Sequence, residues 1–192
     1  MGAPASHVSV QEYLALDEAS DIRHEYLNGI VIAMAGASPR HNVVATNTLA
    51  ALHRALRETP CTVFDSGQRI RVAETGAYVY PDAVVACDTP VFTDERPRSL
   101  ENPLLVVEVL SKTTRDRDEG AKLGHYRRLP SVHEILLVDA NERRVAHYRR
   151  IEPSQWILTD LTEGAVELPC IDATLDLDAL YAKTDGLPRD EA

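Results

Sequence analysis

A single glutamate interrupts the longest apolar run of the chain. Residues 104–110 read Leu-Leu-Val-Val-Glu-Val-Leu, a pattern typical of a central strand that is buried on both faces, with Glu108 inside it. An ionised carboxylate is costly in such a place unless it is paired, hydrogen-bonded or bound to a metal. Two structural explanations compete with a functional role: an edge strand that turns Glu108 to solvent, or a nearby arginine that pairs with it.

A second carboxylate stands at the start of another apolar strand, in the sequence Tyr80-Pro-Asp82-Ala-Val-Val-Ala-Cys87. Pro-Asp alone is commonly a turn and strand-start signature. Together, Asp82 and Glu108 could hold one hard divalent cation such as Mg²⁺, with water completing the octahedron. Such an ion polarises a phosphodiester and lowers the pKa of a bound water. The pair therefore predicts metal-assisted phosphoester hydrolysis.

A lysine follows on a helix that we predict over residues 117–129. Lys122 and Tyr126 are four residues apart, so they share one face of that helix. A lysine directed at the two acids could orient the attacking water and neutralise developing charge. The alternative is a solvated surface lysine. Arginines near it either contact phosphates or form a solvated face compensated by acids; they are Arg115, Arg117, Arg127 and Arg128, with Asp116, Asp118 and Glu119.

The elements that must position these residues follow from caps, turns and periodicity. A capping box at Ser9 opens a short helix through about Leu16, and Asn28-Gly29 predicts a hairpin between residues 23–27 and 30–34. Ser38-Pro39 begins a helix that ends near Glu58. Other strands are expected at 62–64, 69–72, 79–87, 104–110, 133–139, 145–149 and 156–161, and a terminal helix at 176–182. This order predicts an α/β (α+β) fold with a mixed central sheet flanked by helices.

Length and charge limit the function classes. The chain has 192 residues, which suits one domain, here residues 8–184 with tails at 1–7 and 185–192. The net charge of −10 counts against a broad DNA-binding surface, although a local basic or metal-lined cleft is compatible with it. No apolar run approaches the roughly 20 residues of a membrane helix, and residues 1–10 do not resemble a signal peptide. We therefore expect no membrane partner.

The cysteines, the histidines and a strand with two arginines give three further expectations. Cys61, Cys87 and Cys170 are isolated, without a CxxC pair, which predicts reduced thiols and a cytoplasmic protein. The seven histidines lack the short spacing of a structural zinc site. In the 69–72 strand, Arg69 and Arg71 alternate with apolar residues, which predicts a half-exposed antiparallel strand with both arginines on the polar side.

Several motifs, taken together and in order, resemble the Uma2 family, which is grouped with the PD-(D/E)XK nucleases. The resemblance covers about residues 8–180. The motifs that carry it are Tyr26-Leu-Asn-Gly29, Gly36-Ala-Ser-Pro-Arg-His41, Ser66-Gly-Gln-Arg69, Pro81-Asp82, Glu108-Val-Leu-Ser111, Lys122 with Tyr126, and Leu137-Val-Asp139.

The resemblance implies a restriction-endonuclease-like fold and a DNA endonuclease that uses Mg²⁺ or Mn²⁺, for which a homodimer is one expected assembly. Asp82 and Glu108 match the metal ligands, assisted by the backbone carbonyl of Val109. Glu25 matches an acid near the metal, and Gln68 matches a polar position beside it. His41 matches a family histidine and has either a role near the site or a place in the exposed first helical turn.

The position of the functional lysine departs from the superfamily pattern. A Glu-x-Lys motif would place the lysine at position 110, where this chain has Leu110. In the Uma2 family the lysine lies on the following helix, which makes Lys122 its match. Lys112, in Ser111-Lys-Thr-Thr114, has the same strand parity as Glu108 and is the second candidate. Two other functions stay open: a catalytically decayed module for binding or dimerisation, and a hydrolase of a small phosphate or carbonyl substrate.

Overall fold

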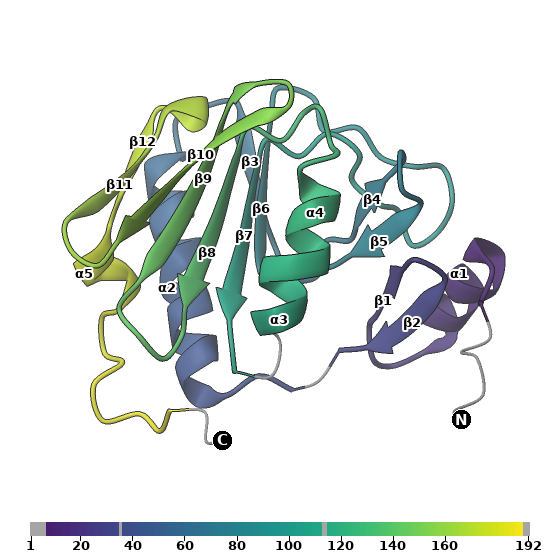
Figure 1. The fold of residues 1–192 in the computed structure, drawn as a ribbon, viewed down its shortest axis with the longest axis horizontal. Helices are drawn as coiled ribbons and strands as arrows, with labels where there is room; N and C mark the ends of the chain where they lie inside the picture. Colours follow the sequence, from purple (N-terminus) through teal and green to yellow (C-terminus); the bar gives the residue numbers. More distant parts are fainter. Residues whose placement is uncertain (1–6, 35, 113–114, 190–192) are drawn as a thin grey trace.

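Six strands form the central mixed sheet of the computed structural model, which describes residues 7–34, 36–112 and 115–189 (Figure 1). Neighbouring strands are antiparallel except β7 and β8, which are parallel. Across the sheet, the order is β10 (Gln155–Leu161), β9 (Val145–Glu152), β8 (Glu134–Asp139), β7 (Leu105–Leu110), β6 (Ala83–Cys87) and β3 (Cys61–Asp65).

Helices cover both faces of this sheet. The long helix α2 (Pro39–Ala55) lies on one face, and a helical segment of three parts lies on the other (Figure 1). That segment consists of α3 (Arg115–Arg117), the π-helical turn η1 (Asp118–Lys122) and α4 (Leu123–Tyr126). Ser38 caps α2 as predicted, because its side chain accepts a hydrogen bond from the backbone N–H of His41.

The two helical layers explain why β7 is so apolar. Val107 packs in a core with Leu52 of α2, and Val106 packs in a second core with Tyr126 of α4. Side chains alternate between the faces of a strand, so Glu108 shares the α4 side with Val106. The sequence thus forms a strand that is buried on both faces, with one carboxylate aimed at the helix that follows it.

A smaller sheet carries the N-terminal part of the chain. Helix α1 (Val10–Ala19) precedes the first strand of this sheet in the chain, and its capping box from Ser9 is present as predicted. The predicted hairpin at Asn28-Gly29 is also confirmed. In order, the strands of this sheet are β2 (Ile30–Ala33), β1 (His24–Leu27), β5 (Ala77–Val79) and β4 (Ile70–Val72).

The C-terminal part forms a short hairpin beside the main sheet (Figure 1). Its strands bury Val166 and Leu175 in the same core as α2, and Leu180 extends that core. The elements are β11 (Ala165–Leu168), the 3-10 turn η2 (Pro169–Ile171), β12 (Ala173–Asp176) and α5 (Leu177–Leu180).

The fold class is as predicted, a mixed sheet flanked by helices, but several boundaries differ. The helix expected at 117–129 begins at Arg115 and ends at Tyr126, and the strand expected at 145–149 extends to Glu152. α1 extends to Ala19, and α2 ends at Ala55, earlier than expected. The expected strand 79–87 is divided between β5 and β6, because Pro81 has no N–H to donate and lies between them. The hairpin of β11 and β12 was not predicted. Thr113, Thr114 and most of the expected N-terminal tail lie outside the described residues, within which no helix is long and apolar enough to cross a membrane.

Cys61 and Cys87 form a disulfide, so the expectation of three reduced thiols is wrong for this pair. β3 and β6 are antiparallel neighbours, and their register sets the two cysteines opposite each other with Cα atoms 3.8 Å apart. Their separation of 26 residues carries no local spacing signal such as CxxC. Cys170 is a free thiol. The cysteines therefore give no support for a reducing compartment.

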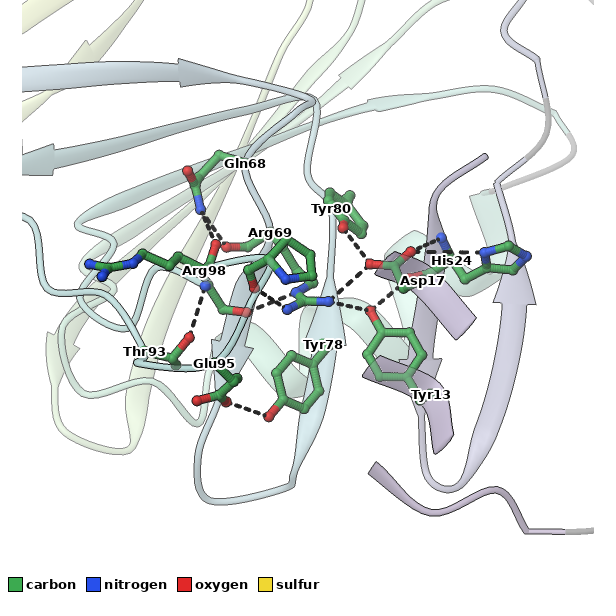
Figure 2. Close-up of polar contacts among 12 residues, drawn as sticks. Tyr13, Asp17, His24, Gln68, Arg69, Tyr78, Tyr80, Thr93, Glu95 and Arg98 are labelled. Atoms are coloured by element: carbon green, nitrogen blue, oxygen red, sulfur yellow. Dashed lines mark hydrogen bonds and ion pairs between the residues drawn. The ribbon is translucent and has the colours of Figure 1, made fainter. Parts of the chain in front are cut away.

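Arg69 is buried, which corrects the expectation that it lies on the exposed side of its strand (Figure 2). Its guanidinium reaches Asp17 of α1, with Nη1 2.9 Å from Oδ2, and both side chains are 1% exposed. Arg71 is half-buried, as the alternation predicts. A buried arginine is tolerated here because a carboxylate pairs with it and other acceptors complete its hydrogen bonds.

Candidate active site

One buried ammonium joins carboxylates from three elements. Lys122 of η1 lies 2.6 Å from Glu108 Oε1 of β7 and 2.8 Å from Glu25 Oε1 of β1, measured from Nζ. Asp118, one helical turn before it, has Oδ1 at 3.6 Å. All four side chains are almost fully buried. The helix after β7 therefore turns its lysine back to the glutamate of that strand and to the small sheet.

Glu25 has one well-bonded oxygen and one without a hydrogen bond. Its Oε1 also accepts from the backbone N–H of Tyr80 at 3.1 Å. Its Oε2 is buried and has no hydrogen-bond partner among the described residues, with Arg117 Nε nearest as an ion-pair contact at 3.5 Å. A buried carboxylate oxygen in this state is costly unless a cation satisfies it. This oxygen is thus suited to a bound cation or an ordered water.

Asp82 lies beside β7, at the start of β6. Its Oδ2 accepts a hydrogen bond of 2.7 Å from the backbone N–H of Val109. Val109 directly follows Glu108, so the Asp82 carboxylate contacts β7 beside that glutamate. Its Oδ1 lies 3.4 Å from His41 Nε2, at the N-terminus of α2. The Asp82 side chain is 19% exposed, so this end of the site is open to solvent while Lys122 and Glu108 are not.

The charges of the site shift the pKa values of its buried groups. Burial raises the pKa of Glu108 well above its usual range, and the carboxylates of Asp118, Asp82 and Glu25 raise it further against the effect of Lys122. Burial alone would lower the pKa of Lys122, but the surrounding carboxylates raise it. The hydroxyl of Tyr126 donates to Glu108 Oε1. The pKa of Glu108 is thus raised first by burial, whereas the pKa of Lys122 is raised by the carboxylates around it.

The donor set fits a hard divalent cation. Asp82, Glu108 and Glu25 offer carboxylate oxygens, the ligands that Mg²⁺ and Mn²⁺ prefer. Within the part of the chain that is described, no three acidic, histidine or cysteine side chains already surround a common metal position. Mg²⁺ commonly needs only one or two protein carboxylates, because it keeps several waters. Asp82 and Glu108 supply that number of carboxylates.

The remaining predicted residues have the following contacts. Val109 contacts Asp82 through its backbone N–H, and the expected role of its carbonyl stays a prediction. The Gln68 amide donates to the carbonyls of Arg69 and Arg98, in the loop cluster of Figure 2. Lys112 is exposed, whereas Lys122 is buried against Glu108.

Most of the arginines near the site contact other side chains, and one of them contacts a carboxylate of the site. Arg115 pairs with Asp139 and Glu119, and Arg128 pairs with Glu74. Arg127 stacks over Tyr148 and Trp156. Arg117, which contacts Glu25, is thus the arginine that reaches the carboxylates.

One residue that sequence reasoning missed is Tyr80. Its backbone N–H contacts Glu25 and its carbonyl accepts from Lys122 Nζ at 3.5 Å. The only sequence signal for it is its place two residues before Asp82. Asp118 was expected only to compensate arginines; its Oδ1 does lie 3.8 Å from Arg117 Nε, and it also contacts Lys122.

Similar proteins are found by family model, by sequence and by structure. A family model named Uma2, described as "Putative restriction endonuclease", matches residues 10–179. An uncharacterized protein of Synechocystis sp. (strain PCC 6803) is 36% identical over 161 residues, 84% of this chain and 91% of the relative. A second one from the same organism is 29% identical over 180 residues, 93% and 94% respectively.

The structural match is a crystal structure from Anabaena variabilis, described as "a putative nuclease belonging to DUF820". It has a TM-score of 0.69 and 17% sequence identity, and the match covers 92% of this chain and 99% of that one. At this identity the match shows a shared fold.

Proposed function

Because the chain belongs to the Uma2 family of nuclease-like proteins, we propose that it is a divalent-metal-dependent endonuclease that hydrolyses DNA phosphodiester bonds. The observation that carries this proposal is the buried Lys122 ammonium, placed against Glu108 and Glu25 beside the partly exposed Asp82. Paired carboxylates can hold a metal ion and a lysine can stabilise developing negative charge, and both contributions assist the hydrolysis of a phosphodiester. The resemblance of these residues to the family motifs gives independent support.

Each residue of the site has a role in this proposal. Asp82 and Glu108 hold Mg²⁺ or Mn²⁺, with Glu25 supporting the ion through its oxygen that lacks a hydrogen bond. The bound ion supplies positive charge to the scissile phosphate. Lys122 orients the attacking water and neutralises charge that develops on the phosphate. Tyr126 holds Glu108 in place.

Access to the site is from the end where α2 begins. His41 and Asp82 are partly exposed there, and Arg117 is 26% exposed beside Glu25. Arg117 and His41 are therefore the groups closest to an entering phosphate. This entrance is compatible with DNA despite the net charge of −10, because a bound metal ion and Arg117 would supply positive charge locally.

The competing function is a catalytically decayed module that binds a partner or dimerises. One observation favours it: the Lys122 ammonium already lies between carboxylates, where a cation would be attracted. Under the endonuclease proposal, a homodimer would supply one active site for each DNA strand, and sedimentation would detect this assembly. We also propose a cytoplasmic location, where DNA is present and where reductants would act on the Cys61–Cys87 pair.

Metal titration with matched variants tests the proposal. Mn²⁺ and Mg²⁺ are titrated calorimetrically into the wild type, Asp82→Asn, Glu108→Gln and the control Asp94→Asn, which changes an exposed loop aspartate. Plasmid nicking is then measured in the same buffers. We expect the wild type and the control to bind metal and nick DNA, and the two site variants to bind at least about 10-fold more weakly.

The outcomes separate the candidate functions. An Asp82→Asn protein that binds metal and nicks DNA normally contradicts the assigned site. Metal binding without cleavage of plasmid or oligonucleotide supports the binding module. Inhibition of nicking by free nucleotides, together with their hydrolysis, supports a small phosphate substrate.

A further inference from the structure

Tyr80 directs its polar groups to two different clusters. Its hydroxyl donates to Asp17 Oδ2 at 2.7 Å, in the cluster that Figure 2 shows. Its backbone N–H and carbonyl contact Glu25 and Lys122, at 3.1 and 3.5 Å. One residue therefore spans from a buried ion pair to the carboxylate and lysine centre.

The ion pair at the hydroxyl end is held from several sides. Besides Asp17, the Arg69 guanidinium donates to Ser99 Oγ at 2.8 Å and to the Pro97 carbonyl, and lies 5.0 Å from the ring centroid of Tyr78. Such a network is rigid because its members are buried and have several partners each. It is a fixed point for anything hydrogen-bonded to it.

Asp17 also reaches Glu25 by a second route. Its Oδ1 accepts from the backbone N–H of His24 at 2.8 Å, and His24 directly precedes Glu25 in β1 (Figure 2). The same carboxylate thus fixes the residue before Glu25 and the hydroxyl of the residue whose N–H bonds to Glu25.

Apart from its contacts with Glu25 and Lys122, the main chain of Tyr80 has no strand pairing within the described part of the chain to fix its position. It lies between β5, which ends at Val79, and β6, which begins at Ala83, so residues 80–82 have no strand pairing. Pro81 lacks an N–H and cannot add a backbone hydrogen bond. Two side chains consequently hold this segment: Asp82, through the N–H of Val109, at its end, and Tyr80, through Asp17, at its start.

Building on the proposed function, we propose that Tyr80 is a positioning residue, whose hydroxyl on the Asp17–Arg69 pair holds its peptide groups against Glu25 and Lys122. The chain would thereby keep a carboxylate of the small sheet and a lysine of η1 in register with Asp82. Pre-organised charges are more effective than ones that must be ordered during the reaction.

The variant Tyr80→Phe removes only the hydroxyl, and Tyr78→Phe is its matched control. Tyr78 is also buried in the cluster, but its hydroxyl donates to Glu95 Oε1 at 3.2 Å, away from the site (Figure 2). Amide hydrogen exchange at residue 80 is measured in the metal-free, full-length protein. Denaturant unfolding of each variant corrects for changes in global stability.

We expect exchange at residue 80 to accelerate about tenfold in Tyr80→Phe, the effect of losing a hydrogen bond to a buried charged group. Tyr78→Phe should leave it unchanged. In the nicking assay with Mn²⁺, Tyr80→Phe should lower kcat with KM for DNA unchanged. Asp17→Asn leaves the buried Arg69 without its carboxylate, so it should also accelerate exchange at residue 80, and its result is compared after correction for its loss of global stability.

Exchange and cleavage distinguish failure of this inference from failure of the proposed function. Exchange at residue 80 that stays within about twofold of the wild type in Tyr80→Phe, or that rises equally in Tyr78→Phe, overturns the inference. A selective rise in exchange in a protein whose wild type does not nick DNA supports the positioning role of Tyr80 and overturns the endonuclease.

Discussion

Lys122 Nζ lies 2.6 Å from Glu108 Oε1, so a lysine of the helical segment that follows β7 pairs with the glutamate of that strand. The contact is made where both side chains are only 3% exposed, in a medium of low dielectric. Such a pair is costly to break, since removal of one partner leaves the other buried and unpaired.

Lys122→Met should therefore impair both cleavage and stability, while Lys112→Met should impair neither. Loss of the ammonium removes a group that stabilises developing charge, and we expect nicking to fall by about 100-fold or more. The metal-free protein should lose about 3 kcal/mol in urea unfolding, because Glu25 and Glu108 remain buried. Cleavage that is lost in Lys112→Met and retained in Lys122→Met would assign the lysine to the strand end instead.

Arg69→Met should destabilise the protein far more than Arg71→Met. The first variant leaves Asp17 buried without its guanidinium, at a cost of about 3–5 kcal/mol. The second removes a partly exposed pair with Glu101, worth about 1 kcal/mol or less. Chemical denaturation of both variants measures the difference. Equal losses would mean that the Asp17 carboxylate finds other partners.

Reduction should destabilise the protein through the Cys61–Cys87 bond. Closure of a 26-residue separation is worth about 3 kcal/mol in the chain-entropy model. Unfolding with and without dithiothreitol measures this loss. A Cys61→Ala/Cys87→Ala variant should be insensitive to the reductant, and Cys170→Ala should remain as sensitive as the wild type. Sensitivity that follows Cys170 would be evidence against the pairing.

Acidification should destabilise the fold in part through His125. Burial and then Arg128 lower the pKa of this imidazole, whose Nδ1 lies 2.8 Å from Thr75 Oγ1. The unfolded chain therefore binds the proton first, at about pH 6.5, and the folded state binds it only at lower pH. The free energy of unfolding should decline as the pH falls below about 6.5. His125→Gln should flatten that decline and His53→Gln, an exposed control on α2, should not.

The carboxylate pair of the site could be predicted because its signals are local. Glu108 stands in an apolar run, and Asp82 follows a proline at the start of another. The hairpin at Asn28-Gly29 and the caps at Ser9 and Ser38 are likewise encoded within a few residues. Lys122 and Tyr126 share a helix face by simple spacing, although part of that helix is a π-turn.

What could not be predicted depends on contacts between distant segments. Arg69 follows the alternation of an exposed strand residue, and only the approach of Asp17 from α1 makes its burial tolerable. Cys61 meets Cys87 through strand pairing, which no spacing motif records. Gln68 matches a family position, yet the conformation of its loop directs it to the carbonyl of Arg98.

The site is assembled from parts that the chain produces at very different times. The hairpin with Glu25 is local and can form early, but its hydrogen bond to Tyr80 spans 55 residues, and Lys122 lies a further 42 beyond Tyr80. Such long-range contacts form late, since loop closure must be completed before they contribute. Synthesis delivers the N-terminal part first. Under the proposed function, a nascent or partly folded copy has no assembled centre, and DNA is exposed only to hydrolysis by completed molecules.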